Sequence, residues 1–450
     1  DEHKMREHRA LFRAISKRVP IKIGNDFEIE WMHVTHSIID SSCIAIKTAA
    51  GTMIHTGDFK IDHTPYDGFP TDIHRLAHYG EEGVLVMTSD STNSHSPGFT
   101  KTEKAVGPTF ERIFATATGR VIMSTFSSNI HRVAQAIEKA LKYGRKICVI
   151  GRSMEKNLDI SMTLGYIKFP KDQFIEAHEI NKYTDKEIMI VTTGSQGESM
   201  SALYRMAIHE HRHVKIKPED QIILSAKAIP GNEGSVSEII NHLLKAGAKV
   251  AYQDFADIHV SGHAAQEEQK LMLRLVKPKF FLPVHGEYNH ALKHGETGVD
   301  CGVLERNVYV MADGEQIEVN PKYLKKVKTV KSGKVYIDNQ LNHKISDDVV
   351  IDRQTMAKEG IVMIVAQINE NDRTLASKPK VATFGFISDK QDRFFTNEIE
   401  EILNTFLLNA KPGIFKNSRI LEDELRKVVR KHCVRKYKKY PMIVPTIFVQ

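Results

Sequence analysis

Short apolar runs alternate with amphipathic segments through the middle of the chain. GRVIMSTF, RKICVIGRS, EIMIVTTGS and DQIILSAKAI are typical of buried strands, and NIHRVAQAIEKALKYG is typical of a helix that ends at Gly144. Strands that alternate with helices are joined by crossovers, which favour a parallel sheet with helices packed on it. The pattern therefore predicts an α/β fold with a largely parallel sheet in the middle section.

The composition changes near residue 321. The basic stretch PKYLKKVKTVKSGK has little apolar periodicity and predicts a linker or an extended ribbon. GIVMIVAQINEN, KVATFGFIS and two helical segments follow, and they predict a small separate α/β domain. Its last helix carries eight basic residues: Arg426, Lys427, Arg430, Lys431, Arg435, Lys436, Lys438 and Lys439. A solvated helical face is the favoured explanation of this cluster, and a surface that contacts phosphate is the alternative.

The composition is that of a globular chain. With 450 residues, 41% hydrophobic and 26% charged, it can bury a large core and should form two to four domains. No apolar run has the length of a membrane span and no segment resembles a signal peptide, so we expect no membrane association. Four widely separated cysteines without a CxxC pair favour a reducing, cytoplasmic location. The excess of Lys+Arg over Asp+Glu, 63 − 56 = 7, permits a polyanionic partner.

Four polar residues follow strand-like runs: His36 in VTHSIIDSS, Asp58 in HTGD, Asp90 in TSDST and His285 in LPVHGE. The carboxyl ends of strands are where α/β layers place their sites, and imidazole and carboxylate groups bind zinc or manganese. Each residue alone has an ordinary explanation, which is a turn for Asp58 and His285 and a capping or core position for His36. Together the four residues favour a metal site.

Eight segments occur in an order that resembles one enzyme family. They are THSIIDSS, HTGDFK, SDSTN, FSSNIHR, TTGSQGE, IPGNE, HVSGHA and PVHGEY. Their order and separations resemble the ribonuclease J family from about residue 15 to PMIVPTIFVQ at the C-terminus. The resemblance implies a metallo-β-lactamase αββα sandwich, incomplete at the N-terminus, with an inserted β-CASP α/β domain and a small C-terminal α/β domain. The parts expected are the metallo-β-lactamase domain at 1–103 and again at 269–320, the β-CASP domain at 104–268, a linker at 321–358 and the C-terminal domain at 359–450.

The resemblance also implies a role for each polar strand end. His36 resembles a ligand of the first of two divalent ions, Asp58 the carboxylate that bridges both, and His285 the last ligand of the second. The ions are expected to be zinc, with manganese as the alternative. Asp90 and His263 resemble a pair in which the aspartate orients the histidine, and the histidine donates a proton to the leaving 3′ oxygen.

A pocket for the RNA 5′-monophosphate is implied in the same way. Ser127, Ser128 and Asn129 stand at the start of a predicted helix, where backbone N–H groups favour an anion. The opposite side of the expected pocket is formed by His259, Val260, Ser261, Gly262 and His263.

The function implied is a metal-dependent ribonuclease. It would remove nucleotides 5′→3′ from single-stranded RNA that bears a 5′-monophosphate, and also cleave RNA internally, in RNA decay and maturation. The expected partners are single-stranded RNA, further copies of the chain in a homodimer or homotetramer, and an RNA helicase or the ribosome. Three alternatives stay open: a small-molecule metallohydrolase, a non-catalytic RNA-binding or scaffold subunit, and a β-CASP DNA nuclease, since no residue shows the 2′-OH being read.

The sequence departs from the family in lacking its first ligand cluster, HxHxDH. The nearest imitation, HEHRH at residues 209–213, lacks the Asp-His ending and is predicted to be surface histidines. His3 and His8 are five residues apart and do not share a helical face well. The other predicted ligands leave two per ion, which is too few for a stable catalytic zinc. We therefore expect the chain as given to bind metal poorly and to be inactive alone, and the intact protein to be a nuclease.

Overall fold

The computed structural model describes residues 13–252, 257–338, 343–388, 392–410 and 412–450. It divides into two compact units, a first unit at Asp1–Lys331 and a second unit at Ser332–Gln450. Both contain helices and strands, which confirms the predicted α/β class. Within the described ranges, no helix combines the length and the apolar character needed to cross a lipid bilayer. His3 and His8 lie outside the described residues.

A six-stranded sheet is the frame of the first unit. Its strands are β1 (Ile21–Ile23), β2 (Phe27–His33), β3 (Ser42–Thr48), β4 (Gly51–His55), β5 (Val86–Asp90) and β11 (Phe280–Val284), in the order β1-β2-β3-β4-β5-β11. The pairs from β1 to β4 are antiparallel, whereas β4, β5 and β11 are parallel. Parallel pairing brings the carboxyl ends of these three strands to one edge of the sheet.

The strands β5 and β11 are neighbours although a complete second sheet separates them in the sequence. All five residues of β5 are buried, as expected for a central parallel strand. The register places Asp90, the last residue of β5, opposite Val284, the last residue of β11. His285 therefore follows directly beside Asp90, an adjacency that depends on long-range strand pairing.

Helices α1 (Ile73–Glu82) and α7 (Gln266–Val276) pack against this sheet, and α8 (Tyr288–Asp300) follows β11. The apolar core between them includes Ile54, Leu76 and Met272. A Cβ at Gly80 of α1 would lie 1.9 Å from the carbonyl oxygen of Leu275 in α7. Only glycine therefore permits the two helices to cross at this distance.

The second sheet of the first unit has five strands. They are β6 (Val121–Ser124), β7 (Lys146–Ile150), β8 (Ile188–Thr192), β9 (Gln221–Leu224) and β10 (Lys249–Ala251), in the order β10-β9-β6-β8-β7. Every pair is parallel, which confirms the parallel sheet predicted for the middle section.

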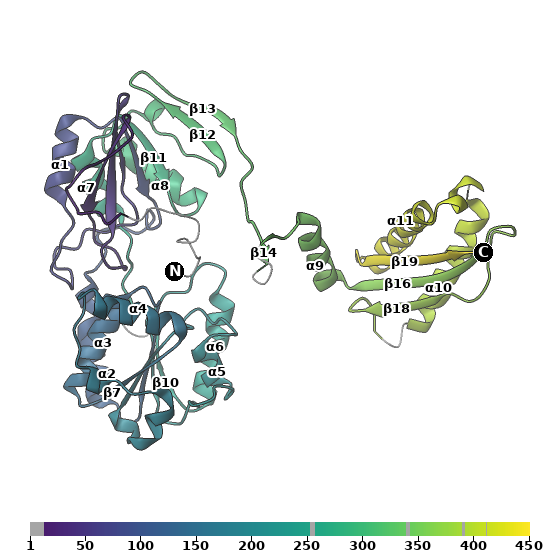
Figure 1. Cartoon of the computed structure of the whole chain (residues 1–450), viewed down its shortest axis with the longest axis horizontal. Helices are drawn as coiled ribbons and strands as arrows, with labels where there is room; N and C mark the ends of the chain where they lie inside the picture. Colours follow the sequence, from purple (N-terminus) through teal and green to yellow (C-terminus); the bar gives the residue numbers. More distant parts are fainter. Residues whose placement is uncertain (1–12, 253–256, 339–342, 389–391, 411) are drawn as a thin grey trace. The chain divides into compact units, whose positions relative to one another are not determined.

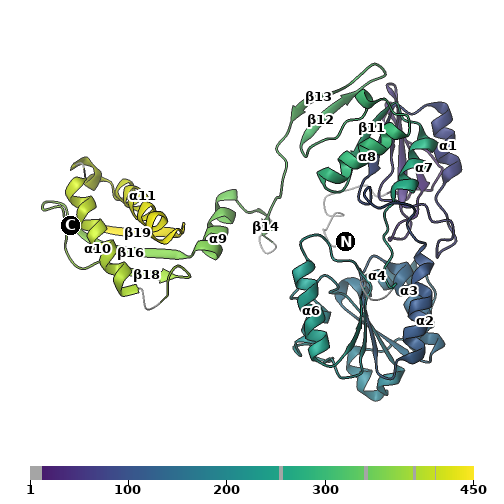
Figure 2. The ribbon, with the colours of Figure 1, turned by 180° about the vertical axis from the view of Figure 1, so that it is seen from behind.

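Helices cover both faces of the five-stranded sheet. They are α2 (Gly107–Thr116), α3 (Ile130–Lys142), α4 (Arg152–Thr163), α5 (Ala202–Ala207) and α6 (Glu233–Lys245). Figures 1 and 2 show α2 and α3 on one side of the sheet and α6 on the other. Two apolar cores result: one contains Phe110, Val133 and Leu158 from α2, α3 and α4, and the other contains Leu203 and Ile239 from α5 and α6. A parallel sheet needs this double cover because both of its faces are apolar.

The second unit has a smaller sheet and a separate core. Its strands are β16 (Ile361–Asn369), β17 (Thr374–Leu375), β18 (Lys380–Phe384) and β19 (Met442–Val449), and β19 pairs parallel with β16. Helices α10 (Asp392–Asn409) and α11 (Ser418–Tyr437) contribute Phe395, Leu403, Leu425 and Val429 to its core. The small α/β unit predicted from the composition change is present.

The predicted linker at 321–358 contains ordered elements. The basic stretch forms β13 (Leu324–Thr329), which pairs with β12 (Glu315–Val319) as an extended ribbon. The two-residue strands β14 (Ile337–Asp338) and β15 (His343–Lys344) pair with each other, and α9 (Asp347–Glu359) follows.

A candidate metal and phosphate site at the strand ends

The four polar strand ends singled out in the sequence meet at one edge of the six-stranded sheet. Asp58 comes three residues after β4, Asp90 ends β5, and His285 follows β11. His36 lies between β2 and β3, where an isolated bridge between Thr35 and Lys60 brings the two loops together. The parallel register of β4, β5 and β11 is therefore what gathers side chains from distant parts of the sequence.

Asp58 lies between the two predicted histidine ligands. Its Oδ2 atom is 3.9 Å from Nε2 of His36 and 3.5 Å from Nε2 of His285. Gly57 before it has a positive φ of 60°, and a Cβ there would lie 2.9 Å from the carbonyl oxygen of Ser42. Asp58 therefore lies in a turn, as the ordinary explanation of a Gly-Asp pair predicts, and its carboxylate also lies near both histidines.

His36 has its ring orientation set by a backbone contact. Its Nδ1 atom lies 2.8 Å from the carbonyl oxygen of Gly262, and because a carbonyl only accepts, Nδ1 carries the proton and donates. Nε2 then keeps its lone pair on the side of Asp58, which is the arrangement seen in metal-binding histidines. Burial lowers the pKa of His36 and favours this neutral form, although the bond to Gly262 opposes the shift.

Gly262 is a glycine for a steric reason. A Cβ at this position would lie 2.6 Å from Nδ1 of His36 and 2.7 Å from Oγ of Ser37. Any larger residue would therefore push the 259–263 segment away from His36. This close approach joins the HVSGHA segment to the candidate metal site.

Asp90 and His263 form the predicted pair. Nδ1 of His263 donates to Oδ2 of Asp90 at 2.7 Å, and Oδ1 of Asp90 accepts from the backbone N–H and the hydroxyl of Thr92 at 3.0 and 2.7 Å. Burial alone would lower the pKa of His263, but the hydrogen bond and the charge of Asp90 outweigh it and raise the pKa. For Asp90, burial opposes ionisation, and the bonds from His263 and Thr92 prevail and lower its pKa. The pair therefore favours a protonated imidazole beside a carboxylate.

The donor atoms suit a transition-metal ion. Among the described residues, His36, Asp58 and His263 place one donor atom each within 4.8 Å of one another, and so do Asp90, His263 and His285. Imidazole nitrogen and carboxylate oxygen are the ligands that zinc and manganese accept. Asp58 and His285 have side chains 42% and 51% exposed, which leaves their open side accessible to further donors. The residues present therefore fit a divalent metal.

The residues predicted to bind phosphate on the first side lie between β6 and α3. Ser127 accepts from Nδ2 of Asn157 through its carbonyl at 3.0 Å and its hydroxyl at 3.2 Å. Ser128 is exposed, and Asn129 is the buried N-cap of α3, with its side chain accepting from the backbone N–H of Arg132 at 3.3 Å. In the first turn of α3, the backbone N–H of Ile130 donates to the carbonyl oxygen of Ser128 at 2.9 Å and that of Arg132 donates to Asn129, so an anion bound here would have to replace these acceptors.

The residues predicted for the opposite side are fixed from several directions. His259 and Val260 contact the Arg132 guanidinium through Nδ1 and the carbonyl oxygen, both at 2.9 Å. Ser261 accepts from Asn93 through its hydroxyl at 2.9 Å. Because Arg132 belongs to the helix that Asn129 caps, one side chain connects both sides of the predicted pocket.

A group of buried charged residues around this site was not predicted from the sequence. Glu268 is fully buried, and its carboxylate accepts from the backbone N–H groups of Ile61, Thr100 and Ala265 at 2.7, 2.6 and 2.9 Å. The other members are Lys60, Asp62, Glu103 and Arg132. Lys60 and Arg132 belong to the segments HTGDFK and FSSNIHR. The sequence does not show that they are buried, because lysine and arginine are usually exposed.

The prediction for HEHRH was wrong for one of its three histidines. His209 and His213 are exposed as expected, but His211 is buried, with a relative exposure of 9%. Its Nδ1 atom accepts from the backbone N–H groups of His213 and Val214 at 3.3 and 3.2 Å. The turn after α5 needs an acceptor for these N–H groups, and His211 supplies it.

Family models match three parts of the chain. "Ribonuclease J, beta-CASP domain" matches residues 118–243, and "Ribonuclease J C-terminal domain" matches residues 348–449. "Zn-dependent metallo-hydrolase RNA specificity domain" matches residues 247–310. Together with the mixed sheets and helices, these matches confirm the predicted fold class of a metallo-β-lactamase-type protein with β-CASP and C-terminal domains.

Curated relatives match nearly the whole chain. Ribonuclease J of Helicobacter pylori (strain ATCC 700392 / 26695) is 57% identical over 99% of this chain, and the match spans 64% of that relative's length. Ribonuclease J 1 of Streptococcus pyogenes serotype M3 is 38% identical over 94% of this chain and 75% of the relative. Ribonuclease J2 of Bacillus subtilis (strain 168) is 33% identical over 93% of this chain and 76% of the relative.

Proposed function

The chain belongs to the ribonuclease J family, and from this premise we propose that the intact protein is a metal-dependent ribonuclease that acts on single-stranded RNA. It removes nucleotides from the 5′ end, prefers a 5′-monophosphate, and also cleaves internally. The observation that carries the proposal is the convergence of His36, Asp58 and His285 with the Asp90–His263 pair at one edge of the sheet.

His36, Asp58 and His285 are the residues that would hold divalent metal, since Oδ2 of Asp58 lies 3.9 Å from Nε2 of His36 and 3.5 Å from Nε2 of His285. Zinc is the proposed metal, with manganese as the alternative, since both accept this donor set. A divalent cation bound there supplies positive charge that stabilises the phosphate oxygens during hydrolysis. The bond from His36 to Gly262 keeps Nε2 unprotonated for this purpose.

His263 is the proposed proton donor. Nδ1 of His263 donates to Asp90, which leaves Nε2–H as the group that faces substrate, and the hydrogen bond and charge of Asp90 raise the pKa of His263, which favours the protonated imidazole. Water attacks the phosphorus atom and releases a proton to solvent, the bond from phosphorus to the 3′ oxygen breaks, and the 3′ oxygen takes the proton from Nε2 of His263. His263 recovers a proton from solvent, and Asp90 stabilises the imidazolium in between.

This chemistry prepares the next 5′ end. Breaking the bond to the 3′ oxygen leaves the phosphate on the 5′ side of the following nucleotide, so each cycle produces a new 5′-monophosphate. A pocket formed by residues 127–129 and 259–263 that binds this group places the next phosphodiester at the metal. The proposed result is successive 5′→3′ removal of nucleotides.

The domain boundaries predicted from the sequence belong to the same proposal. The six-stranded sheet takes its strands from residues 21–90 and 280–284, which supports a metallo-β-lactamase domain at 1–103 and 269–320. The five-stranded sheet within 121–251 supports a β-CASP domain at 104–268. The basic strand β13 lies in the proposed linker at 321–358, and the core of the second unit supports a C-terminal domain at 359–450.

RNA cleavage is favoured over the alternative functions by the relatives, which are named ribonucleases. The small-molecule metallohydrolase, the RNA-binding scaffold and the DNA nuclease have no comparable support. We also propose that the intact protein acts in RNA decay and maturation in the cytoplasm, as a homodimer or homotetramer, with an RNA helicase or the ribosome as partner.

Metal removal tests the proposal on the intact protein. Dialysis against EDTA should abolish degradation of a 5′-monophosphorylated single-stranded RNA, and added zinc or manganese should restore it, while a fully paired duplex of the same sequence should resist throughout. Degradation that persists in metal-free protein would contradict the proposal, and so would a metal-dependent activity confined to DNA.

A further inference from the structure

Arg132 is a fully buried arginine whose hydrogen-bonding capacity is used up by the protein. It lies in the first turn of α3 with 0% of its surface exposed. Nε and Nη2 donate to the carboxylate of Glu103 at 2.7 and 2.8 Å. Nη2 also donates to the carbonyl of Val260 at 2.9 Å, and Nη1 donates to the carbonyl of Ser225 at 3.2 Å and to Nδ1 of His259 at 2.9 Å. A guanidinium has five N–H donors, and all five have a partner here.

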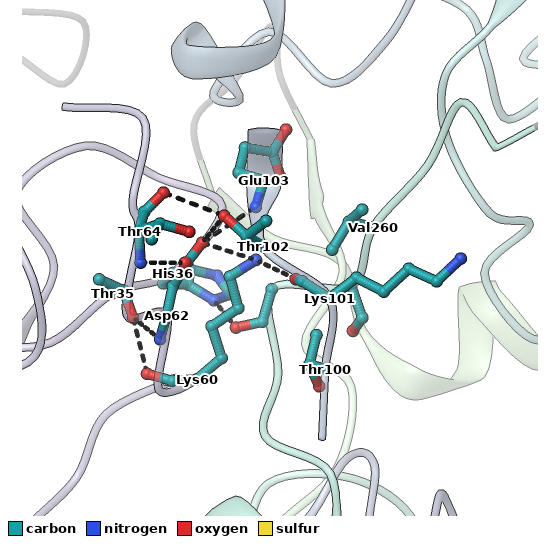
Figure 3. A network of polar contacts seen from close by, with 12 residues as sticks. Thr35, His36, Lys60, Asp62, Thr64, Thr100, Lys101, Thr102, Glu103 and Val260 are labelled. Carbon is teal, nitrogen blue, oxygen red and sulfur yellow. Dashed lines mark hydrogen bonds and ion pairs between the residues drawn. The ribbon is translucent and has the colours of Figure 1, made fainter. Parts of the chain in front are cut away.

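Glu103 connects Arg132 to the loop that follows the candidate metal ligand Asp58. The backbone N–H of Glu103 and the hydroxyl of Thr102 both donate to Oδ2 of Asp62 at 2.9 Å. Lys60 lies 3.7 Å from the same carboxylate and donates to the carbonyl of Lys101 at 3.0 Å. Figure 3 shows these contacts between the loop at 60–64 and the segment at 100–103. Lys60 and Asp62 are 2% and 3% exposed, so water does not weaken the ion pair.

The other side of Arg132 holds the segment that reaches the metal site. Val260 lies two residues before Gly262, whose carbonyl oxygen accepts from His36, and three before the proposed proton donor His263. The chain passes from the six-stranded to the five-stranded sheet after β5 and returns before β11. We call the parts of these connections at 100–103 and 258–263 the crossing segments. Arg132 binds both of them, through Glu103 and Val260. Its own helix begins at Asn129, in the proposed 5′-phosphate pocket.

Arg132 also sets the proton position on His259. A guanidinium only donates, so Nδ1 of His259 must accept and the ring proton stays on Nε2. Burial and the charge of Arg132 lower the pKa of His259 to about 3, which keeps the ring neutral in the working pH range. His259 thus offers one fixed N–H donor to an anion in the pocket.

Arg132 differs from another buried arginine of the first unit in the segments that it binds. Replacing a buried ion pair by apolar residues of similar volume is often neutral or stabilising, so a buried arginine is an expensive way to fill a core. The first unit contains a comparable group away from the site, Arg120, which binds Asp220 at 2.9 and 2.5 Å and the carbonyl of Lys215 at 2.7 Å. Asp220 and Lys215 lie in neither crossing segment, so Arg120 serves as a matched comparison.

We propose that Arg132 is a positioning residue that couples the 5′-phosphate pocket to the cleavage site. By holding 259–263 against Glu103, it sets the spacing between the terminal phosphate and the phosphodiester at the metal. The inference rests on the proposed function and deepens it. Cleavage that begins at a 5′ end needs both subsites engaged at once, whereas internal cleavage needs only the reacting phosphodiester.

The test compares two RNA substrates in the intact protein with Arg132→Lys. Lysine keeps the charge but has one nitrogen in place of the planar fork, so it cannot bind Glu103, Val260 and His259 together. Hydrolysis of a linear 5′-monophosphorylated RNA should lose about 10-fold or more in kcat/KM, since small misplacements are costly, and cleavage of a circular RNA of the same sequence should change by less than about 3-fold. A 5′-hydroxyl version of the linear RNA should lose less than the monophosphate.

Two further variants make the result decisive. Glu103→Gln removes the charge that orients Arg132 and leaves the residues of the pocket unchanged. It should shift the ratio of linear to circular RNA cleavage in the same direction as Arg132→Lys. This variant keeps the inference testable if Arg132→Lys does not fold. Arg120→Lys should lower the melting temperature but leave the ratio unchanged. Equal losses on linear and circular RNA, or an unchanged ratio in both site variants, would overturn the inference. A wild-type protein that cleaves neither RNA would instead refute the proposed function.

Discussion

The two units of the chain bury different kinds of side chain. In the first unit, the buried residues include Lys60, Asp90, Glu103, Arg132 and Glu268, which lie close to the candidate site or to the crossings beside it. In the second unit, every buried residue in the described ranges is apolar, glycine or proline. Buried charge costs free energy unless it is fully paired, and apolar burial is the ordinary source of folding stability. The first unit therefore buries charge both around the candidate site and elsewhere, as at Arg120, whereas the described core of the second unit is apolar.

The contrast extends to residues of the same type. Each unit has a histidine bound to a carboxylate at 2.7 Å: His263 with Asp90 in the first, and His432 with Glu398 in the second. Asp90 is 2% exposed, whereas the Glu398 side chain is 19% exposed. Equal hydrogen-bond lengths therefore do not imply equal roles. Three comparisons between the units, and one test within the second unit, examine the difference.

The largest effect is expected from the two histidines. His263→Ala in the intact protein should slow RNA cleavage by ~100-fold or more, because it removes the proposed proton donor for the leaving 3′ oxygen, while RNA affinity stays near the wild-type value. His432→Ala should leave turnover unchanged. Single-turnover gel assays measure the rate and filter binding measures the affinity. An unchanged cleavage rate in His263→Ala would contradict the proposed role of His263 as proton donor.

The next effect concerns two paired carboxylates. Glu30 is 2% exposed and accepts from Arg75 at 2.6 and 2.7 Å and from Tyr79 at 2.8 Å. Glu30→Gln should lower the free energy of unfolding of the first unit by about 1.5–3 kcal/mol at pH 7, because a charged hydrogen bond is lost in a buried place. Glu398→Gln in the second unit should cost about 1 kcal/mol or less, as for a more exposed pair. Urea denaturation of each variant gives both numbers.

The cost of Glu30→Gln should depend on pH in a defined direction. The hydrogen bonds from Arg75 lower the pKa of Glu30 below its ordinary value of 4.5, against the opposing effect of burial. A carboxyl group with a lowered pKa stabilises the folded state above its unfolded pKa, and this contribution disappears as the pH falls through the folded pKa. The difference between wild type and variant should therefore be full at pH 7 and shrink below pH 4.5. If the difference in unfolding free energy between wild type and Glu30→Gln grew as the pH fell, the charge of Glu30 would not be the source of the stabilisation of the folded state.

A smaller effect is expected from two asparagines that cap helices. Ser127→Ala combined with Asn129→Ala should reduce the preference for 5′-monophosphate over 5′-hydroxyl RNA by about 10-fold, because both residues line the proposed pocket. Asn417→Ala, at the N-cap of α11, should cost only helix stability and leave the preference intact. Competition between the two RNAs in one reaction gives the preference directly. An equal loss on both substrates would count against the pocket.

The smallest effect is expected from the basic face of α11. Arg430, Lys431 and Arg435 are exposed, whereas Lys427 and Lys436 pair with Glu424 and Glu398. If this face is only solvated, Lys431→Ala with Arg435→Ala should change RNA affinity by less than about 2-fold and leave its salt dependence unaltered. A fall in the slope of log affinity against log salt by about 2 would show that both residues contact phosphate and would blur the contrast between the units.

The architecture was readable from sequence where burial follows residue type. FEIEWMHV, GRVIMSTF and GIVMIVAQINEN become β2, β6 and β16, and the alternation of strands and helices gives the parallel sheet. The polar strand ends could be picked out because an apolar run stops at them. The pairing of β5 with β11 brings them together. These two strands are separated in the sequence by the whole five-stranded sheet, so no local sequence pattern predicts that they pair.

The buried charges could not be predicted for a different reason. Lys60, Arg132 and Glu268 look like surface residues in sequence, since their types are mostly exposed in proteins. Their burial depends on partners supplied by other segments, such as Glu103 for Arg132. His211 was misjudged for the same reason, because its role is to accept from the backbone of its own turn.

The central claim is that His36, Asp58 and His285 hold divalent metal for RNA hydrolysis, and anomalous diffraction tests it most directly. Crystals of the intact protein grown with zinc and measured on both sides of the zinc edge should show anomalous peaks about 2.0–2.2 Å from Nε2 of His36, a carboxylate oxygen of Asp58 and Nε2 of His285. Bound zinc located away from these atoms, with no peak between the two imidazoles and the carboxylate, would contradict the account.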